Sequence, residues 1–284
     1  MNPEQLTDEE TEEAERRARP RSAVIYETIR KEGSVELERA PASLFWSALA
    51  SGLSMVFSLV TMGVLRAALP DTKWAQMVTA LGYSMGFLIV ILGRQQLFTE
   101  NTLTPLLPLF SDRKVWVLRR VARLWLVVFV GNLAGTAIAS AWVAFSGAFT
   151  PEQQHAFAQI AKDAVAPSTV HVFTKAIFAG WVIALMVWLL PLTEVFAPVI
   201  VIILTWLISA AKLEHVIAGS ADTLYGLWTG AIGWGDFAHF LLPTLFGNIV
   251  GGVAFVAAVA TAEIATEHGG PKQKKERVRA ARGG

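Results

Sequence analysis

Long apolar runs are the feature that most constrains the fold of this chain. A transmembrane helix needs about 20 predominantly apolar residues to cross roughly 30 Å of hydrocarbon. Six regions of sufficient length occur, at residues 44–65, 78–110, 115–145, 172–192, 198–228 and 237–264. Of the 284 residues 54% are hydrophobic and 17% charged, whereas soluble domains carry about 25% charged residues. The sequence therefore predicts an all-α polytopic membrane protein with six transmembrane helices.

Lysine and arginine are distributed unevenly among the segments that connect these regions. Seven lie before residue 40, five between 113 and 123, and six between 272 and 282. The alternate connections hold only Arg66, Lys73, Lys162 and, at the start of the fourth region, Lys175. Because basic residues are retained on the cytoplasmic side, both termini are predicted to be cytoplasmic. A net charge of +1 indicates no nucleic-acid partner.

Composition divides the chain into three parts. Residues 1–40 are predicted to be a charged cytoplasmic tail, 41–265 the six-helix transmembrane domain, and 266–284 a basic cytoplasmic tail. Within the first tail, apolar residues among charged ones at 23–40 are compatible with an amphipathic helix on the membrane surface, although Gly33 lies in its middle.

An internal repeat relates the two halves of the chain. The sequence GNLAG at 131–135 recurs as GNIVG at 247–251, an offset of 116 residues. The same offset places Thr99 onto His215, and both residues lie in polar interruptions, of the second and fifth apolar regions respectively. Since three crossings per half reverse the direction of the chain, this pattern predicts two inverted three-helix repeats with broken second and fifth helices, as in many transport proteins.

The two interruptions are the predicted functional site. A broken helix is tolerated in a membrane only where protein or a cavity shields its backbone, so Thr99 and His215 are expected to face each other near the midplane. An ionisable residue deep in a membrane segment is a functional candidate. The neighbouring Glu214 either contributes to the pore or caps the following half-helix. Asn132 and Asn248 are expected to hydrogen-bond exposed backbone at the breaks.

Enzyme signatures are missing from the sequence. HExxH, GxSxG and Walker-type GxxxxGK[ST] patterns do not occur. The chain has no cysteine, which excludes disulfides and thiolate metal sites. We therefore expect neither enzymatic activity, nor a metal, nor a cofactor.

Two segments carry a family resemblance. LFTENTL at 97–103 and EHVIA at 214–218, together with the paired GNxxG motifs, resemble the formate/nitrite transporter family over about residues 40–265, and the tails are most like its YfdC branch. This resemblance implies an aquaporin-like subunit in a homopentamer in the bacterial inner membrane, each subunit with a pore for small monovalent anions such as formate or nitrite. It implies His215 and Thr99 as pore residues and Lys162 as an approximate match to a vestibule lysine. The implied apolar constrictions are Tyr83, Phe87, Leu97, Phe98, Ile183 and Ile208.

Two positions depart from the family pattern. Gly219 stands where the family often has asparagine, and Gly180 stands in place of a second pore-side asparagine. Both positions lack the polar group of the family pattern. The usual substrate range of the family is therefore in question for this chain, whereas the fold is not.

The expected mechanism is passage of a weak acid in neutral form. A positive potential would draw the anion into a vestibule, and protonation there would avoid moving a bare charge through an apolar constriction. Channel-like and proton-coupled movement are both compatible with these residues. The alternatives are a neutral-solute channel of the water/glycerol type, whose paired Asn-Pro-Ala motifs are missing, and a non-transporting membrane scaffold or sensor on the same fold.

Overall fold

The computed structural model describes Thr7 and residues 22–112, 115–192 and 195–269, and these residues contain helices and no strand. Most of the two predicted tails, at 1–6, 8–21 and 270–284, lies outside the described residues. The prediction of an all-α chain is therefore confirmed for the described part.

Five described stretches are long and apolar enough to cross a membrane. They are α3 (Pro41–Ala68), α4 (Lys73–Gly82) with α5 (Ser84–Leu92), α7 (Val115–Phe145), α9 (Thr169–Leu189) with η3 (Leu190–Leu192), and α12 (Trp234–Gly269), of which residues 234–258 form the apolar part. The chain is thus an integral membrane protein by the length and composition of its helices.

The two interrupted regions are divided in the structure. The region expected at 198–228 forms α10 (Ala197–Ala210) and α11 (Val216–Trp228), with 14 and 13 residues, and each is too short to cross alone. The region expected at 78–110 leaves the helical conformation after α5 and continues through η2 (Glu100–Thr102) into α6 (Leu106–Asp112). Both breaks occur where the sequence places polar residues among apolar ones.

Small residues bring the long helices into contact. A side chain at Gly135 of α7 would collide with the backbone of α3 at Leu49, and one at Gly251 of α12 would collide with the carbonyl of Ile177 in α9. In lipid, such close backbone approach is what small residues permit. These two pairs, α3 with α7 and α9 with α12, form the frame that holds the breaks.

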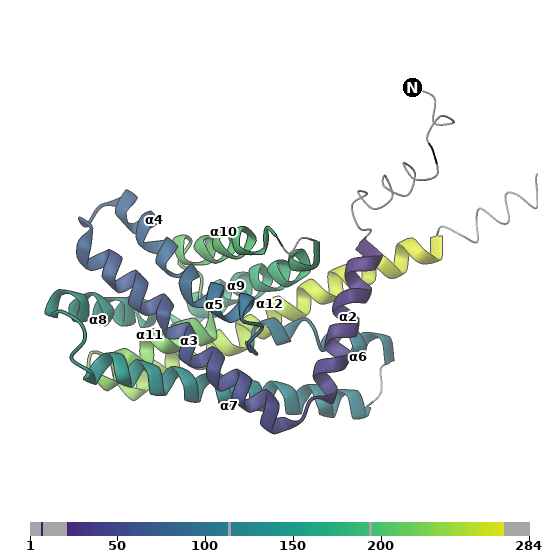
Figure 1. The fold of residues 1–284 in the computed structure, drawn as a ribbon, viewed down its shortest axis with the longest axis horizontal. Helices are drawn as coiled ribbons and strands as arrows, with labels where there is room; N and C mark the ends of the chain where they lie inside the picture. Colours follow the sequence, from purple (N-terminus) through teal and green to yellow (C-terminus); the bar gives the residue numbers. More distant parts are fainter. Residues whose placement is uncertain (1–6, 8–21, 113–114, 193–194, 270–284) are drawn as a thin grey trace, which may run out of the picture.

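Helix α2 (Ser22–Glu38) runs across one end of the bundle beside α6, rather than along it (Figure 1). Its buried residues recur every four positions at Ile25, Ile29, Gly33 and Leu37. At Gly33 the helix touches the backbone carbonyl of Thr104, so closely that a Cβ would not fit. We call this end of the bundle the α2 end.

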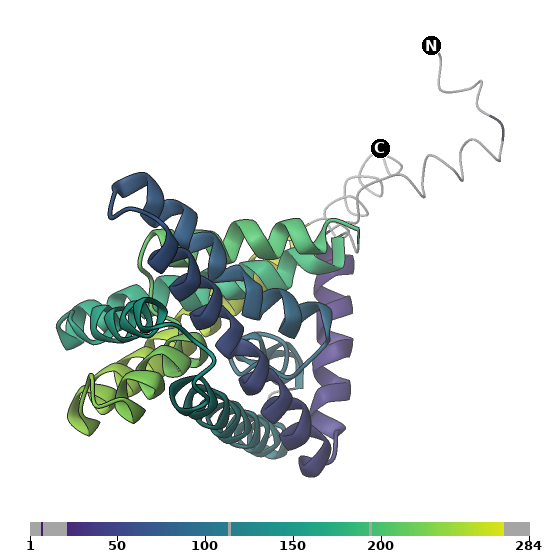
Figure 2. The same cartoon turned by 60° about the vertical axis from the view of Figure 1, so that its left-hand side comes forward.

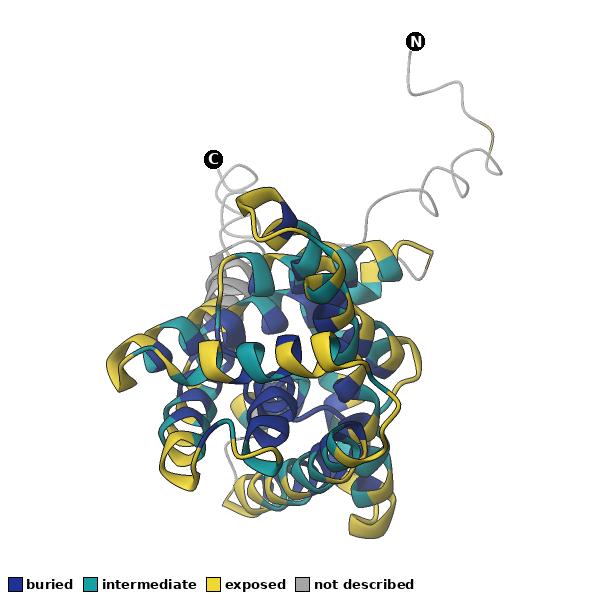
Figure 3. Cartoon of the chain, turned by 90° about the vertical axis from the view of Figure 1, so that its left-hand side faces the viewer, coloured by how far each residue is buried: buried dark blue, intermediate teal, exposed yellow. Residues whose placement is uncertain are grey.

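Helix α8 (Pro151–Val165) lies at the opposite end, which we call the α8 end (Figures 1 and 2). A view onto this end shows buried residues in the middle of the bundle and exposed residues around it (Figure 3). Many of the exposed side chains are large and apolar, including Trp46 (66% exposed), Trp142 (75%) and Phe178 (65%). An apolar outer surface of this kind suits contact with lipid or with other membrane-embedded chains.

Candidate functional site

The half-helices α5 and α10 end in the same way. Arg94 and Lys212, two residues past their last helical residues, adopt left-handed φ angles of 48° and 52°. In each case the next amide, of Gln95 or Leu213, donates to the carbonyl five residues earlier, at 3.0 and 2.8 Å. This is the Schellman arrangement, in which the chain reverses while carbonyls of the last turn stay hydrogen-bonded. It lets the helix stop inside the bundle without leaving those groups unpaired.

Asn132 of α7 supports the first break. Its Oδ1 accepts the amide of Phe98 at 2.8 Å, and its Nδ2 donates to the carbonyls of Gln96 at 2.9 Å and of Ala48 at 2.8 Å. All three bonds are buried, where an unpaired backbone group costs about 1–3 kcal/mol. The asparagine therefore fixes the break to α3 and α7 together.

Asn248 of α12 supports the second break with the same set of bonds. Its Oδ1 accepts the amide of Val216 at 2.8 Å, and its Nδ2 donates to the carbonyls of Glu214 at 2.9 Å and of Ala176 at 2.8 Å. Because Val216 begins α11, its amide has no partner within the helix. The side chain of Asn248 supplies that partner.

These bonds correct the register expected between the two halves. Phe98 and Val216 occupy equivalent positions 118 residues apart, as do Arg94 and Lys212, so the breaks do not share the offset of 116 that relates the GNxxG motifs. His215 is thus equivalent to Leu97 and not to Thr99. Thr99 is instead the partner of His215 across the interface between the breaks.

Thr99 and His215 form a buried hydrogen bond at the centre of the bundle. Thr99 Oγ1 lies 2.7 Å from His215 Nε2, and the two residues are 0% and 1% exposed. The backbone N–H of Ala218 donates to His215 Nδ1 at 3.2 Å, so that nitrogen must carry a lone pair. The proton of the neutral ring is then on Nε2, which donates to Thr99. The threonine hydroxyl keeps its own hydrogen for another acceptor.

Two aromatic rings lead from the α8 end of the bundle to this pair. Tyr83, at the junction of α4 and α5, packs on Phe87 with ring centres 5.1 Å apart, and Phe87 packs edge-on against His215 at 5.0 Å. Tyr83 is 6% exposed and Phe87 is fully buried. The imidazole is therefore separated from the α8 end by aromatic side chains.

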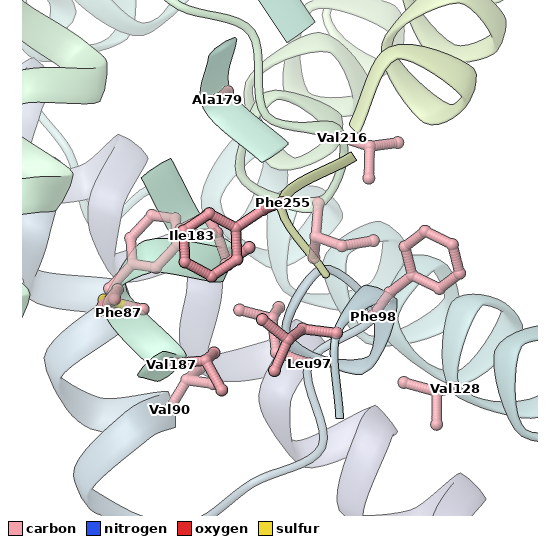
Figure 4. Close-up of a cluster of buried hydrophobic side chains, with 14 of the residues drawn as sticks. Phe87, Val90, Leu97, Phe98, Val128, Ala179, Ile183, Val187, Val216 and Phe255 are labelled. Atoms are coloured by element: carbon pink, nitrogen blue, oxygen red, sulfur yellow. The ribbon is translucent and has the colours of Figure 1, made fainter. Parts of the chain in front are cut away.

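The other apolar residues expected at constrictions are buried in the same cluster. Leu97, Ile183 and Ile208 are 0% exposed, and Phe98 is 2% exposed. Figure 4 shows Leu97 and Ile183 in one group with Phe87, and Phe98 lies beside them. Phe98 also packs edge-on against Phe129 of α7, with ring centres 5.1 Å apart. An apolar layer thus surrounds the Thr99–His215 pair.

A vestibule of about 1050 Å³ opens at the α8 end. It is lined by residues of α3, α4, α8, α9 and α11 and by the second break, and it reaches Tyr83, Glu214 and Asp222 at its inner wall. The chain therefore offers a water-accessible approach to the aromatic residues above His215.

The lysine that approaches Glu214 is not Lys162. Lys162 is exposed on α8 and is not among the residues that line the vestibule. Lys175, near the start of α9, lines it and places its Nζ 3.9 Å from Glu214 Oε1. Glu214 is 9% exposed, so this ion pair lies at the inner wall.

Neighbouring atoms explain both departures from the family pattern. The ring of Phe240 in α12, itself fully buried, fills the space that a side chain at position 219 would take. At position 180, a side chain would collide with the backbone of Asn248. The ring of Phe240 therefore leaves room only for glycine at position 219. Glycine at position 180 allows α9 to approach Asn248, which supports the second break.

Comparison with known proteins places this arrangement in a family. The profile of the formate/nitrite transporter family matches residues 23–262. The chain belongs to this family. Inner membrane protein YfdC of Escherichia coli (strain K12) is 39% identical over 263 residues, which is 92% of this chain and 85% of that protein. Formate channel FocA of Haemophilus influenzae is 24% identical over 241 residues, 75% of this chain and 84% of that protein.

Solved structures support the fold. An FNT family ion channel superposes with a TM-score of 0.74 at 17% identity, covering 82% of this chain and 96% of that chain. A pentameric formate channel with formate bound gives a TM-score of 0.69 at 19% identity, covering 80% and 98%. The family is one of transport channels, which agrees with the expected transport function.

Sequence reasoning assigned no role to three residues that the structure places at the site. In the sequence Lys175 is distinguished only by its position near the start of an apolar region, and Phe240 carries no polar signal. Asp222 follows His215 by seven residues, and seven residues are close to two helical turns. That spacing indicates that Asp222 lies about two turns along the half-helix that His215 caps.

Proposed function

We propose that this chain forms a transmembrane channel or transporter for small monovalent weak-acid anions, formate, nitrite or a similar species. The observation that carries the proposal is the Thr99–His215 hydrogen bond, held between two broken helices beneath the vestibule. Membership of the formate/nitrite transporter family and relatives named formate channels support the substrate class.

We further propose six membrane segments in two inverted three-helix repeats, with α4–α5–α6 and α10–α11 as the broken second and fifth. The matching Schellman ends and asparagine supports favour this arrangement. The distribution of basic residues favours cytoplasmic termini, and the YfdC relative favours the bacterial inner membrane. The pentameric neighbour and the apolar outer surface favour a homopentamer embedded in lipid.

In the proposed mechanism the anion is protonated before it crosses the apolar layer. An unpaired charge in that layer would cost far more than a hydrogen-bonded neutral acid. His215 Nε2–H donates to the Thr99 hydroxyl, and that hydroxyl can donate its own hydrogen to a substrate oxygen. Phe87, Leu97, Phe98, Ile183 and Ile208 exclude hydrated ions, while Tyr83 and Glu214 border the vestibule.

Uptake into liposomes reconstituted with the purified protein tests the proposal. Formate, nitrite, acetate and hydrosulfide are offered at an acidic and a near-neutral pH, to wild type and to His215→Phe. His171→Phe is a matched control, since His171 is an exposed residue at the start of α9. Saturable uptake that depends on His215 and not on His171 supports the proposal. Wild-type uptake no greater than that of empty liposomes contradicts it.

A further inference from the structure

The charge of the vestibule differs from the positive potential that the sequence-based mechanism expects. Its lining holds three cationic side chains, Arg66, Lys175 and Lys212. Its carboxyl groups number five: Asp71, Glu152, Asp163, Glu214 and Asp222. A free anion that enters this space therefore meets more acidic than basic groups, and its local concentration is lowered.

Asp222 is the carboxyl group in this lining that has a buried oxygen without a hydrogen-bond partner among the described residues. The residue is 6% exposed, and its Oδ1 is buried without a hydrogen bond to any of the residues that the structure describes. By contrast, Glu214 faces Lys175, and Asp163 accepts a hydrogen bond from Arg66 at 2.7 Å. A buried carboxyl oxygen without a partner is destabilising unless a ligand or a proton completes it.

The position of Asp222 places it on the way to His215. It lies seven residues after His215, the residue that caps the start of α11, which corresponds to a rise of about 10 Å along the helix axis. Tyr83 and Glu214 are near enough to interact with its charge, and all three residues line the vestibule. Tyr83, which packs on Phe87, and Asp222 line the same vestibule, so substrate that approaches Tyr83 enters the space that Asp222 borders.

His215 is poorly arranged to supply the proton. Its Nδ1 already accepts the amide of Ala218 at the start of α11, and its Nε2 proton is donated to Thr99. A second proton on the ring would break the bond to Ala218. Giving up the Nε2 proton would leave an imidazolate among apolar side chains. The pair is therefore arranged to bind an acid that already carries its proton.

We propose that Asp222 is the proton-coupling residue of the vestibule, sharing one proton with the incoming weak-acid anion. This inference rests on the proposed function. Two carboxylates at contact distance cannot both remain charged, so one anion and Asp222 together hold one proton. On transfer the O–H bond of Asp222 breaks and an O–H bond forms on the substrate oxygen. A hydronium ion in the vestibule water then returns a proton to Asp222 and leaves a water molecule.

Other titratable and charged groups also border this space. The break contributes Lys212 and Glu214, α9 contributes Lys175, and the α4–α5 junction contributes Tyr83. Helix α8 contributes Glu152, His155 and Asp163, and α3 with the connection after it contributes Arg66 and Asp71. Helices α7 and α12 pack on α11 without adding a charged side chain to the described lining. Asp222 and Glu214 are the buried carboxyl groups of this lining, and Asp222 differs from Glu214 in its unpartnered oxygen.

The test compares wild type with Asp222→Asn in liposomes and in planar bilayers. Isotopic formate uptake is measured from pH 5 to 8, and formate current is measured under voltage. An amide keeps the shape and a hydrogen-bond donor but cannot carry the transferred proton. We expect the pH 5 to pH 8 uptake ratio to rise at least about tenfold, because only acid already protonated in bulk water can then cross the apolar layer, and formate current to stay small. Asp222→Glu should restore proton coupling.

Asp236→Asn removes the same charge from the exposed start of α12, at the same end of the bundle, and should match wild type. An unchanged uptake ratio in folded Asp222→Asn overturns the role of Asp222. If the amide variant does not fold, Asp222→Ser is measured instead, and large wild-type formate currents at neutral pH also overturn the proposal. Absence of uptake in wild type contradicts the proposed function itself, so the two failures are distinguishable.

Discussion

Replacing Thr99 with valine removes one hydroxyl from the centre of the molecule and changes the shape of the side chain very little. The His215 Nε2–H then loses the acceptor that lies 2.7 Å away, at a site where both residues are at most 1% exposed. An unsatisfied buried donor costs about 1–3 kcal/mol, and we expect that decrease in the free energy of unfolding. The variant also loses one hydrogen bond to the substrate, worth about 1 kcal/mol, and this loss should lower flux about fivefold.

The assay combines denaturant titration in mixed micelles with formate uptake into liposomes. Thr223→Val is the matched control, because Thr223 is fully buried in α11 but donates its hydroxyl only to backbone of its own helix, to Gly219 O at 2.7 Å and Ser220 O at 3.5 Å. Those carbonyls keep a partner within the helix. We therefore expect Thr223→Val to lower the free energy of unfolding by only about 0.5 kcal/mol and to leave flux unchanged. Equal losses in the two variants, or full flux in Thr99→Val, would refute the reasoning.

Three further variants test the way in which the site is held. His215→Asn should be about 1 kcal/mol more stable than His215→Phe in denaturant titration, because asparagine can still cap the start of α11, whereas flux should be lost in both; equal stability would show that the bond to Ala218 is unimportant. Asn248→Ala leaves the amide of Val216 without its acceptor and should lower the free energy of unfolding by about 3 kcal/mol; a decrease under 1 kcal/mol would contradict this. Gly219→Asn should be destabilising alone and recover by at least about 1 kcal/mol in combination with Phe240→Ala, which a double-mutant cycle measures. Additive effects there would show that the ring does not limit position 219.

The sequence identifies the membrane segments and the breaks because both leave local signals. Apolar length marks the helices, and the polar residues around Thr99 and His215 mark the interruptions. The repeated GNxxG motifs likewise point to the two asparagines, since a buried amide needs several partners and exposed backbone at a break supplies them. Signals of this kind depend on residues that are close together in the chain.

The register of the breaks could not be obtained in the same way. Arg94 precedes Asn132 by 38 residues, whereas Lys212 precedes Asn248 by 36, so counting back from the asparagines shifts one break by two positions. The left-handed residues themselves are basic, although glycine is the usual residue in this conformation. Phe240 presents a different difficulty, because its effect on position 219 arises from packing between α11 and α12 and leaves no local pattern.

The two breaks share a backbone plan but differ in chemistry, and the difference is required by hydrogen bonding. An imidazole at position 97 as well as at 215 would compete for the Thr99 hydroxyl, and one ring would remain unpaired in an apolar layer. Leu97 avoids this conflict. With the offset of 118 residues, the position equivalent to Asp222 is Thr104, and the surroundings of the two residues differ. Thr104 lies against Gly33 of α2, whereas Asp222 borders the open vestibule. Proton exchange with water is therefore favoured at the α8 end, which is where the proposed role of Asp222 requires it.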